Sequence, residues 1–366
     1  MAHINTIDTP ALIIERSVLE NNLLKMQHTA EMNVINLRPH IKTHKMPRLA
    51  AMQIDHGAIG IACAKLGEAE IIAAAGIDNI QIANIITGQQ KIERLIRLNE
   101  RISRLSVCVD SPESASELSK AFAELKPIRV LIEVDSGFHR AGIESFDKIA
   151  ELARDIISMP GIEFEGIMTH AGHAYAAPNP REVRRVGLQE GKLMSDLKIF
   201  LEVRRIPCRV VSVGSTPTAR WCSRGREVTE LRAGNYIFHD MIQVMLGSCK
   251  IEDCALNVLS TVISVPTEDR AVIDAGSKAL GLDLGGHGNT SLSGHGYIYN
   301  KDAEIVRLSE EHGVLRTGED NFKYGERIRI IPNHACAVVN LYDRAYLVDK
   351  EEIIEEIEIA ARGRMQ

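Results

Sequence analysis

Short β-rich runs alternate with segments of helical periodicity over the first two-thirds of the chain. The runs with strand character are Val34–Leu37, Ile59–Cys63, Ile80–Ala83, Leu105–Val109, Ile128–Val134, Ile162–Met168, Val210–Val213 and Val228–Leu231. The helical patterns between them include Gly67–Ala75, Glu113–Leu125 and Arg181–Arg204. Such alternation indicates βα units and a parallel sheet. Eight strands before residue 240 favour an α/β fold of the closed (β/α)₈ TIM-type barrel over an open doubly wound sheet.

Local signals mark the starts of two helices. Ser17 is followed three residues later by Glu20, a capping box that predicts a helix beginning at Ser17. Ser111 is a candidate N-cap, and Pro112 after it stands at the first helical position, where proline is tolerated.

The pattern of the sequence changes around residue 245. β-branched runs at Val258–Val265, Ala271–Asp274, Arg327–Ile331 and Ala337–Leu341 are separated by Gly-rich turns such as Leu282–Gly288 and Ser293–Gly296. We therefore predict a barrel over residues 1–245 and a smaller C-terminal β domain over residues 246–366. The extended piece at residues 10–14 is a candidate strand of that β domain. Lys350–Arg362 has acidic residues early and arginines late, the order that a helix dipole favours, so a terminal helix is predicted.

Composition narrows the class of protein. A net charge of −6 without a basic block argues against nucleic acid as a partner. The sequence shows no charged-then-apolar leader and no run of about 18 apolar residues, so a cytoplasmic protein that does not enter a membrane is expected. The seven cysteines are scattered and form no CxxC pair, which indicates reduced thiols rather than a disulfide framework.

The segment Arg38-Pro-His-Ile-Lys-Thr-His-Lys45 has the densest chemistry. On a strand, Arg38, His40 and Lys42 would share one face. At the end of the first barrel strand that face would point into the mouth of the barrel, where barrel enzymes keep their active sites. Its basic and imidazole groups would repel one another without an anion, and phosphate is the simplest candidate. A solvated basic turn is the alternative.

Other strand ends carry polar groups. The turn after residues 130–134 presents Arg140 between glycines, either as a fixed fork of donors for a ligand or as the partner of a nearby acid. Val213-Gly-Ser-Thr-Pro-Thr218 and Arg232-Ala-Gly-Asn-Tyr236 follow the seventh and eighth strands, the usual phosphate cradle of such barrels. Met168-Thr-His-Ala-Gly-His-Ala-Tyr175 ends the sixth strand with groups suited to proton transfer.

His334 and Cys336 form the last candidate site. They stand two residues apart in Pro332-Asn-His-Ala-Cys-Ala337, so on a strand they would project to the same side. Imidazole and thiolate together suit Zn²⁺, and two protein ligands suit a catalytic metal with open positions rather than a structural zinc. A packed histidine beside a buried thiol is the alternative.

Together these segments resemble the D-threonine aldolase / D-serine dehydratase family of pyridoxal 5'-phosphate (PLP) enzymes, which have a barrel of the alanine racemase N-terminal type. The resemblance covers nearly the whole chain, from Asp8-Thr-Pro-Ala11 to Pro332–Asn340. The Arg-Pro-His-x-Lys-Thr-His-Lys string and the closing His-x-Cys are its specific motifs.

The resemblance implies roles for individual residues. Lys42 is implied to carry PLP, with Lys45 as second choice, and Arg140 to approach the phenolic oxygen of the cofactor. The residues expected to contact the cofactor are His40, Lys42, Arg140, His170, Gly214, Ser215, Thr216, Gly234, Asn235 and Tyr236. Lys42, His173 and Tyr175 are the candidate catalytic groups, and His334 and Cys336 the metal pair, with Zn²⁺ favoured over Mn²⁺ or Mg²⁺.

Within the family, His-x-Cys and His170-x-Gly-x-x-Tyr175 favour the dehydratase branch over the aldolases, which end in His-x-Asp. Ala337 stands where a proline commonly follows the cysteine. The implied substrate is D-serine, D-threonine or D-3-hydroxyaspartate. Lys42 would remove the α-proton while the metal makes the β-hydroxyl a leaving group, giving a 2-oxo acid and ammonia. A D-threonine aldolase, which releases glycine and an aldehyde, is the alternative.

Two other classes are weighed against this interpretation. A racemase would need acid–base groups on both faces of Cα and no metal. A non-catalytic PLP carrier would resemble the barrel alone, and the long β domain argues against it. The family resemblance also implies a homodimer.

Overall fold

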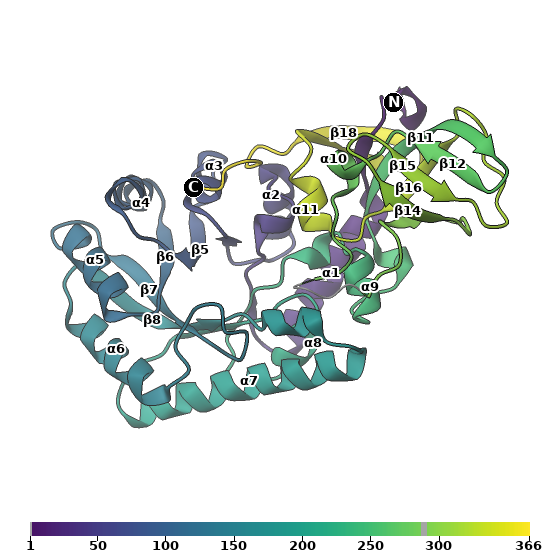
Figure 1. Ribbon diagram of the computed structural model, residues 1–366. Coiled ribbons are helices and arrows are strands. Elements are labelled where there is room, and N and C mark those ends of the chain that lie inside the picture. The colour runs from purple at the N-terminus through teal and green to yellow at the C-terminus, as the bar shows by residue number, and fades with distance from the viewer. Residues whose placement is uncertain (1, 287–290) are drawn as a thin grey trace.

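The computed structural model describes residues 2–286 and 291–366 and contains two sheets (Figure 1). A curled parallel sheet is formed by the first two-thirds of the chain, and a mostly antiparallel sheet by the last third with the N-terminal strands. The N-terminus lies beside the antiparallel sheet, whereas the C-terminus returns to the barrel, where Gly67 N donates to Gln366 O at 2.9 Å (Figure 1).

The parallel sheet has eight strands in the order β3-β10-β9-β8-β7-β6-β5-β4. The strands are β3 (Asn36–Leu37), β4 (Ile61–Cys63), β5 (Asn79–Ile85), β6 (Arg104–Val109), β7 (Ile128–Val134), β8 (Ile162–Thr169), β9 (Val210–Val213) and β10 (Glu230–Leu231). Its two edges meet, because His40 and Ala62 form a parallel bridge beyond β3. The prediction of eight parallel strands in an alanine-racemase-type barrel is confirmed.

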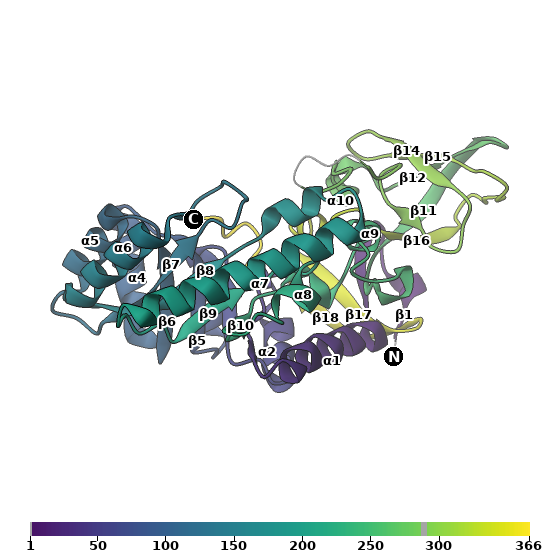
Figure 2. The ribbon, with the colours of Figure 1, turned by 90° about the horizontal axis from the view of Figure 1, so that it is seen from below.

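Helices cover the outside of this sheet, and the longest of them, α7, runs from the barrel toward the β domain (Figure 2). They are α1 (Arg16–Met32), α2 (Pro47–Asp55), α3 (Leu66–Ala74), α4 (Gln89–Arg101), α5 (Pro112–Phe122), α6 (Phe146–Ser158), α7 (Pro180–Val203), α8 (Ala219–Cys222) and α9 (Met241–Met245). No helix of the described residues is long and apolar enough to span a lipid bilayer.

The expected cap of α5 is confirmed and that of α1 is wrong. Ser111 Oγ accepts from Ser114 N at 3.2 Å. Helix α1 begins at Arg16 without a side-chain cap, and Glu20 instead accepts from Arg16 Nε at 2.8 Å. A local ion pair at i,i+4 therefore engages the acid that the capping box would need.

The second sheet closes on itself, since β11 pairs with both β12 and β16. Its strands are β1 (Ala2–His3), β2 (Ala11–Glu15), β11 (Leu256–Thr267), β12 (Arg270–Ile273), β13 (Tyr297–Ile298), β14 (Glu304–Leu308), β15 (Gly313–Arg316), β16 (Arg327–Ile331), β17 (Arg344–Asp349) and β18 (Glu352–Glu358). The N-terminal strand β2 lies in this sheet, between β11 and β17.

Two elements of this domain differ from the prediction. The expected terminal helix over Lys350–Arg362 is wrong: its core is β18, where Ile353 and Ile357 turn inward with the two-residue alternation of a strand. The expected strand Ala337–Leu341 is also wrong, because its first residues belong to the buried helix α11 (Ala335–Val339). The second short helix is α10 (Ser277–Leu280). The predicted turn Leu282–Gly288 lies partly outside the described residues.

The two domains meet where α11 packs against the short 3₁₀ helix η2 (Ile41–Thr43) of the barrel. Cys336 of α11 lies beside this helix, with its Sγ 3.1 Å from Thr43 Oγ1. The C-terminal tail adds a second link, since Ala361 N donates to Lys45 O at 3.1 Å. The fold thereby places the segment with His334 and Cys336 next to the segment with Lys42.

Candidate active site

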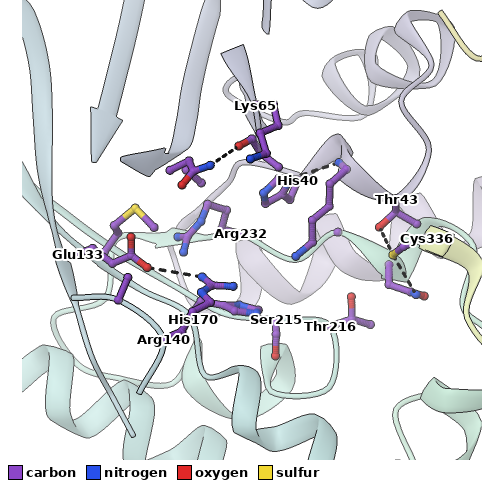
Figure 3. Close-up of a pocket in the computed structure, with 18 of the residues that line it drawn as sticks. His40, Thr43, Lys65, Glu133, Arg140, His170, Ser215, Thr216, Arg232 and Cys336 are labelled. Carbon is purple, nitrogen blue, oxygen red and sulfur yellow. Dashed lines mark hydrogen bonds and ion pairs between the residues drawn. The ribbon is translucent and has the colours of Figure 1, made fainter. Parts of the chain in front are cut away.

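A pocket of about 260 Å³ lies at the carboxyl ends of the barrel strands, and Cys336 of the β domain forms part of its wall (Figure 3). It brings together ten of the residues proposed from the sequence, namely His40, Lys42, Arg140, His170, Tyr175, Ser215, Thr216, Gly234, Asn235 and Cys336. Four others, His173, Gly214, Tyr236 and His334, are not among its lining residues.

The basic segment reaches the pocket by a route other than the expected strand. Strand β3 ends at Leu37, and Lys42 lies in η2. Arg38 does not share a face with His40 and Lys42, because its guanidinium pairs with buried Glu230 at 2.8 Å. His40, beyond the strand, and Lys42, in the 3₁₀ turn, both line the pocket.

The surroundings of the two candidate lysines distinguish them. Lys45 Nζ lies 3.3 Å from Glu68 and donates to Asn340 Oδ1 at 3.0 Å. Lys42 lines the pocket and, within the described residues, has no such ion pair. Burial lowers the pKa of Lys42, and the charges of Arg140 and Arg232 lower it further. The lowered pKa makes the neutral, nucleophilic form of the Lys42 amine more accessible than it is for an exposed lysine, whereas Lys45 is held in an ion pair.

The imidazole of His40, beside Lys42, is held neutral. Burial lowers the pKa of His40 well below its ordinary value, and the positive charges of Lys42 and Arg232 add to this effect. His40 Nδ1 accepts a hydrogen bond from Lys42 N at 3.3 Å. The pocket is therefore less cationic than its count of basic residues suggests.

His44 lies two residues beyond Lys42, and its titration makes the free energy of unfolding depend on pH. It is fully buried, and burial lowers its pKa to about 4. In the unfolded chain the pKa is about 6.5, so the unfolded state binds the extra proton in the window between these values. Stability contributed by neutral His44 is fully present above pH 6.5 and is lost as pH falls toward 4, by about 3 kcal/mol.

We expect His44→Asn to flatten this dependence, because the asparagine oxygen can accept from Met46 N as His44 Nδ1 does, yet cannot titrate. Urea unfolding of both proteins across the window measures the effect. Equal slopes of unfolding free energy against pH would contradict the assignment.

Arginines and one acid surround the pocket on the side opposite Cys336 (Figure 3). Arg140 lies 3.5 Å from Glu133, a buried acid near the end of β7. Burial raises the pKa of Glu133, and Arg140 and Arg232 oppose the rise. Arg232 is fixed by bonds to Ser212 Oγ at 2.6 Å and Thr169 O at 2.5 Å. These contacts hold a permanent cation in the pocket wall.

The two Gly-rich loops lie together at one end of the pocket. Within the described part of the chain, no hydrogen bond engages the backbone N–H of Thr216, Gly234 or Asn235. A Cβ at Gly234 would lie 2.7 Å from His40 O, so only glycine allows this approach. Ser215 and Thr216 add hydroxyl groups to the wall. Free N–H donors and hydroxyls at one end of a cavity suit a phosphate group.

Two residues expected in this cradle are engaged elsewhere. Gly214 N donates to Glu190 Oε1 at 2.8 Å. The phenol of Tyr236 lies in the core, where it accepts from Gln53 Nε2 at 3.1 Å, although Tyr236 N supports the cradle by donating to Thr216 Oγ1 at 3.0 Å.

Only some of the polar groups in the segment after β8 face the pocket. His170 and Tyr175 line the pocket, and burial raises the pKa of the Tyr175 phenol, as do the charges of Cys336 and Asp240. His173 faces the turn after β7, since a Cβ at Gly137 would lie 3.6 Å from its Cε1. The structure therefore brings Tyr175 to the candidate chemistry and leaves His173 outside the pocket lining.

His334 and Cys336 are brought together by a helix start, not by a strand. His334 is the N-cap of α11, and Cys336 lies in its first turn, two residues away. Asp283 Oδ2 lies 2.5 Å from His334 Nδ1. Burial disfavours ionisation of Cys336, yet the contact with His334 and the charge of Lys42 lower its pKa overall. Carboxylate, imidazole and thiol in series are the arrangement that orients a metal-binding histidine.

The chain was then compared with known proteins. It matches "Alanine racemase, N-terminal domain" over residues 14–241 and "Putative serine dehydratase domain" over residues 255–348. The D-threo-3-hydroxyaspartate dehydratase of Delftia sp. (strain HT23) is 34% identical, over 91% of this chain and 92% of that protein. The D-threonine aldolase of Arthrobacter sp. is 33% identical, over 98% and 93%.

This chain belongs to the D-threonine aldolase / D-serine dehydratase family. The resemblance inferred from the sequence is therefore confirmed, and members of this family are PLP-dependent lyases. The solved structure of the Delftia dehydratase superposes with a TM-score of 0.90 at 31% identity, covering 98% of this chain and 99% of that one. A D-threonine aldolase from Filomicrobium marinum also gives 0.90, at 29% identity, covering 98% and 97%.

Within the described residues of this family member, one set of three possible metal ligands lies within 4.8 Å, and it is not the expected pair. It consists of Asp135, His139 and Glu144, of which the last two are exposed. Asp135 Oδ1 already accepts three backbone N–H groups of its own turn. This cluster lies outside the pocket lining, so the pair at Cys336 is the better candidate for chemistry.

Three pocket or supporting residues were missed. Glu133 and Arg232 carried a signal, because each is a charged residue at or just after the carboxyl end of a barrel strand. No signal in the sequence pointed to Asp283. It stands 51 residues before His334, and only the folded β domain brings the two side chains together.

Proposed function

We propose that this protein is a PLP- and metal-dependent dehydratase of D-β-hydroxy amino acids, which it converts to a 2-oxo acid and ammonia. The observation that carries the proposal is the Cys336 thiol in the pocket wall, two residues from His334, whose ring is oriented by Asp283. Solved structures of D-threo-3-hydroxyaspartate dehydratase include a histidine-to-alanine variant and a metal-free cysteine-to-alanine variant. The two substituted positions lie two residues apart, as His334 and Cys336 do.

The pocket residues fit the cofactor. Lys42 would hold it covalently, because its amine lines the pocket and its lowered pKa makes the nucleophilic form more accessible, whereas Lys45 is paired with Glu68. The unengaged N–H groups of Thr216, Gly234 and Asn235 would hold its phosphate. Arg140 and Arg232 supply fixed positive charge, whereas His40 stays neutral beside Lys42.

The residues at Cys336 also fit a divalent metal. Asp283 fixes the orientation of the His334 ring, which leaves Nε2 as the ligand atom. A thiolate paired with an imidazole favours Zn²⁺ over Mn²⁺ or Mg²⁺. Two protein ligands leave positions open for a substrate hydroxyl.

Several of these residues would take part in the elimination of water from the substrate. When bound, PLP supplies an electron sink for charge at Cα, and the metal supplies Lewis acidity toward the β-hydroxyl oxygen. Lys42, once free, accepts the α-proton on its neutral amine. Tyr175 keeps its phenolic proton, because burial raises its pKa, and so can donate to the departing oxygen. Cys336, in the wall of the pocket that Lys42 also lines, and His334 would hold that metal.

The aldolase is the second candidate, supported by the similarity to the Arthrobacter enzyme. That reaction requires a group that accepts the β-hydroxyl proton. Tyr175 is unsuited to this role, because its raised pKa keeps it protonated. His173, the other sequence candidate, is not among the lining residues.

We expect purified protein loaded with PLP and Zn²⁺ to convert D-threonine mainly to 2-oxobutyrate and ammonia. Both 2-oxobutyrate and glycine should be measured in the same sample, with L-threonine as the control substrate. Predominance of glycine and acetaldehyde would make the protein an aldolase and reject the dehydratase proposal.

A further inference from the structure

Asp240 is a buried acid that plays no part in the proposed chemistry, yet it lies between the two halves of the site. It is the N-cap of α9 and is 0% exposed. No salt bridge within the described ranges involves it, and its two oxygens accept hydrogen bonds instead. A buried carboxylate is costly unless donors surround it, which makes the choice of donors informative.

The first donors belong to the metal-pair segment. Ala335 N, between His334 and Cys336, donates to Asp240 Oδ2 at 2.9 Å. The two residues after Asp240 add backbone bonds to the same segment: Met241 N donates to Pro332 O and Ile242 N to Asn333 O, each at 3.1 Å. The metal pair is thus anchored on the start of α9 by three hydrogen bonds.

The second donor belongs to the phosphate cradle. Asn235 Nδ2 donates to the same Oδ2 atom at 2.6 Å, and it also approaches Cys336 Sγ at 3.8 Å. Oδ1 accepts from Gln243 N at 3.0 Å, which fixes the carboxylate against its own helix. One oxygen atom therefore joins a barrel loop to a segment of the β domain about 100 residues away.

We propose that Asp240 is a positioning residue that sets the metal pair relative to the phosphate cradle. The proposal rests on the proposed function, since it assumes that His334 and Cys336 bind the metal. A carboxylate is required because the surrounding groups are all N–H donors. An amide at this position could accept at one site only and would turn its NH₂ toward another donor.

The effect expected is a loss of metal affinity rather than of cofactor. We expect Asp240→Asn to weaken Zn²⁺ binding roughly 10- to 100-fold, the usual range for groups that orient ligands. The cofactor absorbance should persist, since Lys42 is not bonded to Asp240, and Asn235 would hold the phosphate by its backbone N–H rather than by the side chain that Asp240 binds. In activity assays kcat should fall at low Zn²⁺ and recover in part at high Zn²⁺.

The experiment measures Zn²⁺ affinity by competition with a chromogenic chelator in parent, Asp240→Asn, Asp240→Ala and Asn179→Ala holoenzymes, each checked for thermal unfolding. Asn179 is the matched control, because it caps α7 by accepting from Glu182 N at 3.0 Å, and none of its hydrogen bonds within the described residues reaches the metal-pair segment. Weakened Zn²⁺ binding in Asp240→Asn with parental binding in Asn179→Ala supports the proposal.

Two results overturn it. Asp240→Asn that folds and binds Zn²⁺ within twofold of the parent shows that the carboxylate does not position the pair. Equal weakening in Asn179→Ala shows a general effect of stability. If the parent itself binds no Zn²⁺, the metal part of the proposed function fails first, and that result is distinguishable because it appears without any substitution at Asp240.

Discussion

Lys42→Ala is expected to lower the turnover of D-β-hydroxy amino acids by roughly 10³-fold or more. The substitution removes both the covalent attachment of the cofactor and the base for the α-proton, and a general base alone contributes about 10²- to 10⁴-fold. The Lys42 amine lines the pocket without an ion pair within the described residues, and alanine leaves no amine at this position. Steady-state assays on D-threonine or D-serine measure the loss.

Lys45→Ala is the matched control for this prediction, since it lies three residues away and was the second candidate. Its amine is held by Glu68 and Asn340, so the variant is expected to keep the cofactor absorbance. Borohydride reduction followed by peptide mapping locates the modified lysine directly. A cofactor-modified peptide at Lys45, or full activity in Lys42→Ala, would contradict the assignment.

Most of the barrel could be predicted from the sequence because it repeats one local pattern, a buried strand followed by a helix. Buried strands such as β7 are nearly continuous apolar runs, and the helices between them have the caps and periodicity that a short window reveals. Strands β3 and β10 have only two residues each, and there the predicted bounds were too long. Closure at these strands depends on single bridges such as His40–Ala62, which no periodicity encodes.

The errors in the β domain have a common cause. Residues 352–358 contain four glutamates and three isoleucines, a composition that a helix and an edge strand both accept. This segment forms a strand because it pairs with the edge of β17. At Ala337–Leu341 small and β-branched residues suggested a strand, but the first of these residues belong to α11, whose segment docks on the start of α9. Tertiary partners overrode local preference in both cases.

Site residues could be predicted where one segment of the sequence carries the pattern. They could not be predicted where their role depends on a contact between two distant segments. Lys42, Arg140 and the Gly-rich loops lie at strand ends, which the barrel brings to one face. The direction of a single side chain is decided by its neighbours, so Tyr236 turned into the core and His173 toward Gly137. Asp240 and Asp283 act through contacts with distant segments, and only the folded chain reveals those contacts.

Cys336→Ala is expected to lower metal-dependent turnover by roughly 10³-fold, because Lewis-acid help to a leaving hydroxyl is worth several kcal/mol and about 1.4 kcal/mol corresponds to a factor of ten. The cofactor absorbance should remain, since Lys42 and the phosphate cradle are untouched. Assays with and without EDTA, alongside spectra of the purified variant, separate these two effects. Activity that survives both chelation and the substitution would reject the metal role.

Cys336→Asp tests whether the thiolate itself matters. A carboxylate at this position keeps two ligand groups but replaces a soft donor with a hard one, so metal preference should move from Zn²⁺ toward Mn²⁺ or Mg²⁺. Because His-x-Asp is the pattern associated with the aldolase branch, the ratio of glycine to 2-oxobutyrate from D-threonine is the informative measurement. A higher ratio would mean that the ligand helps to select the bond that breaks. An unchanged ratio would mean that the proton-transfer groups around Lys42 and Tyr175 make that choice, with Cys336 serving only to hold the metal.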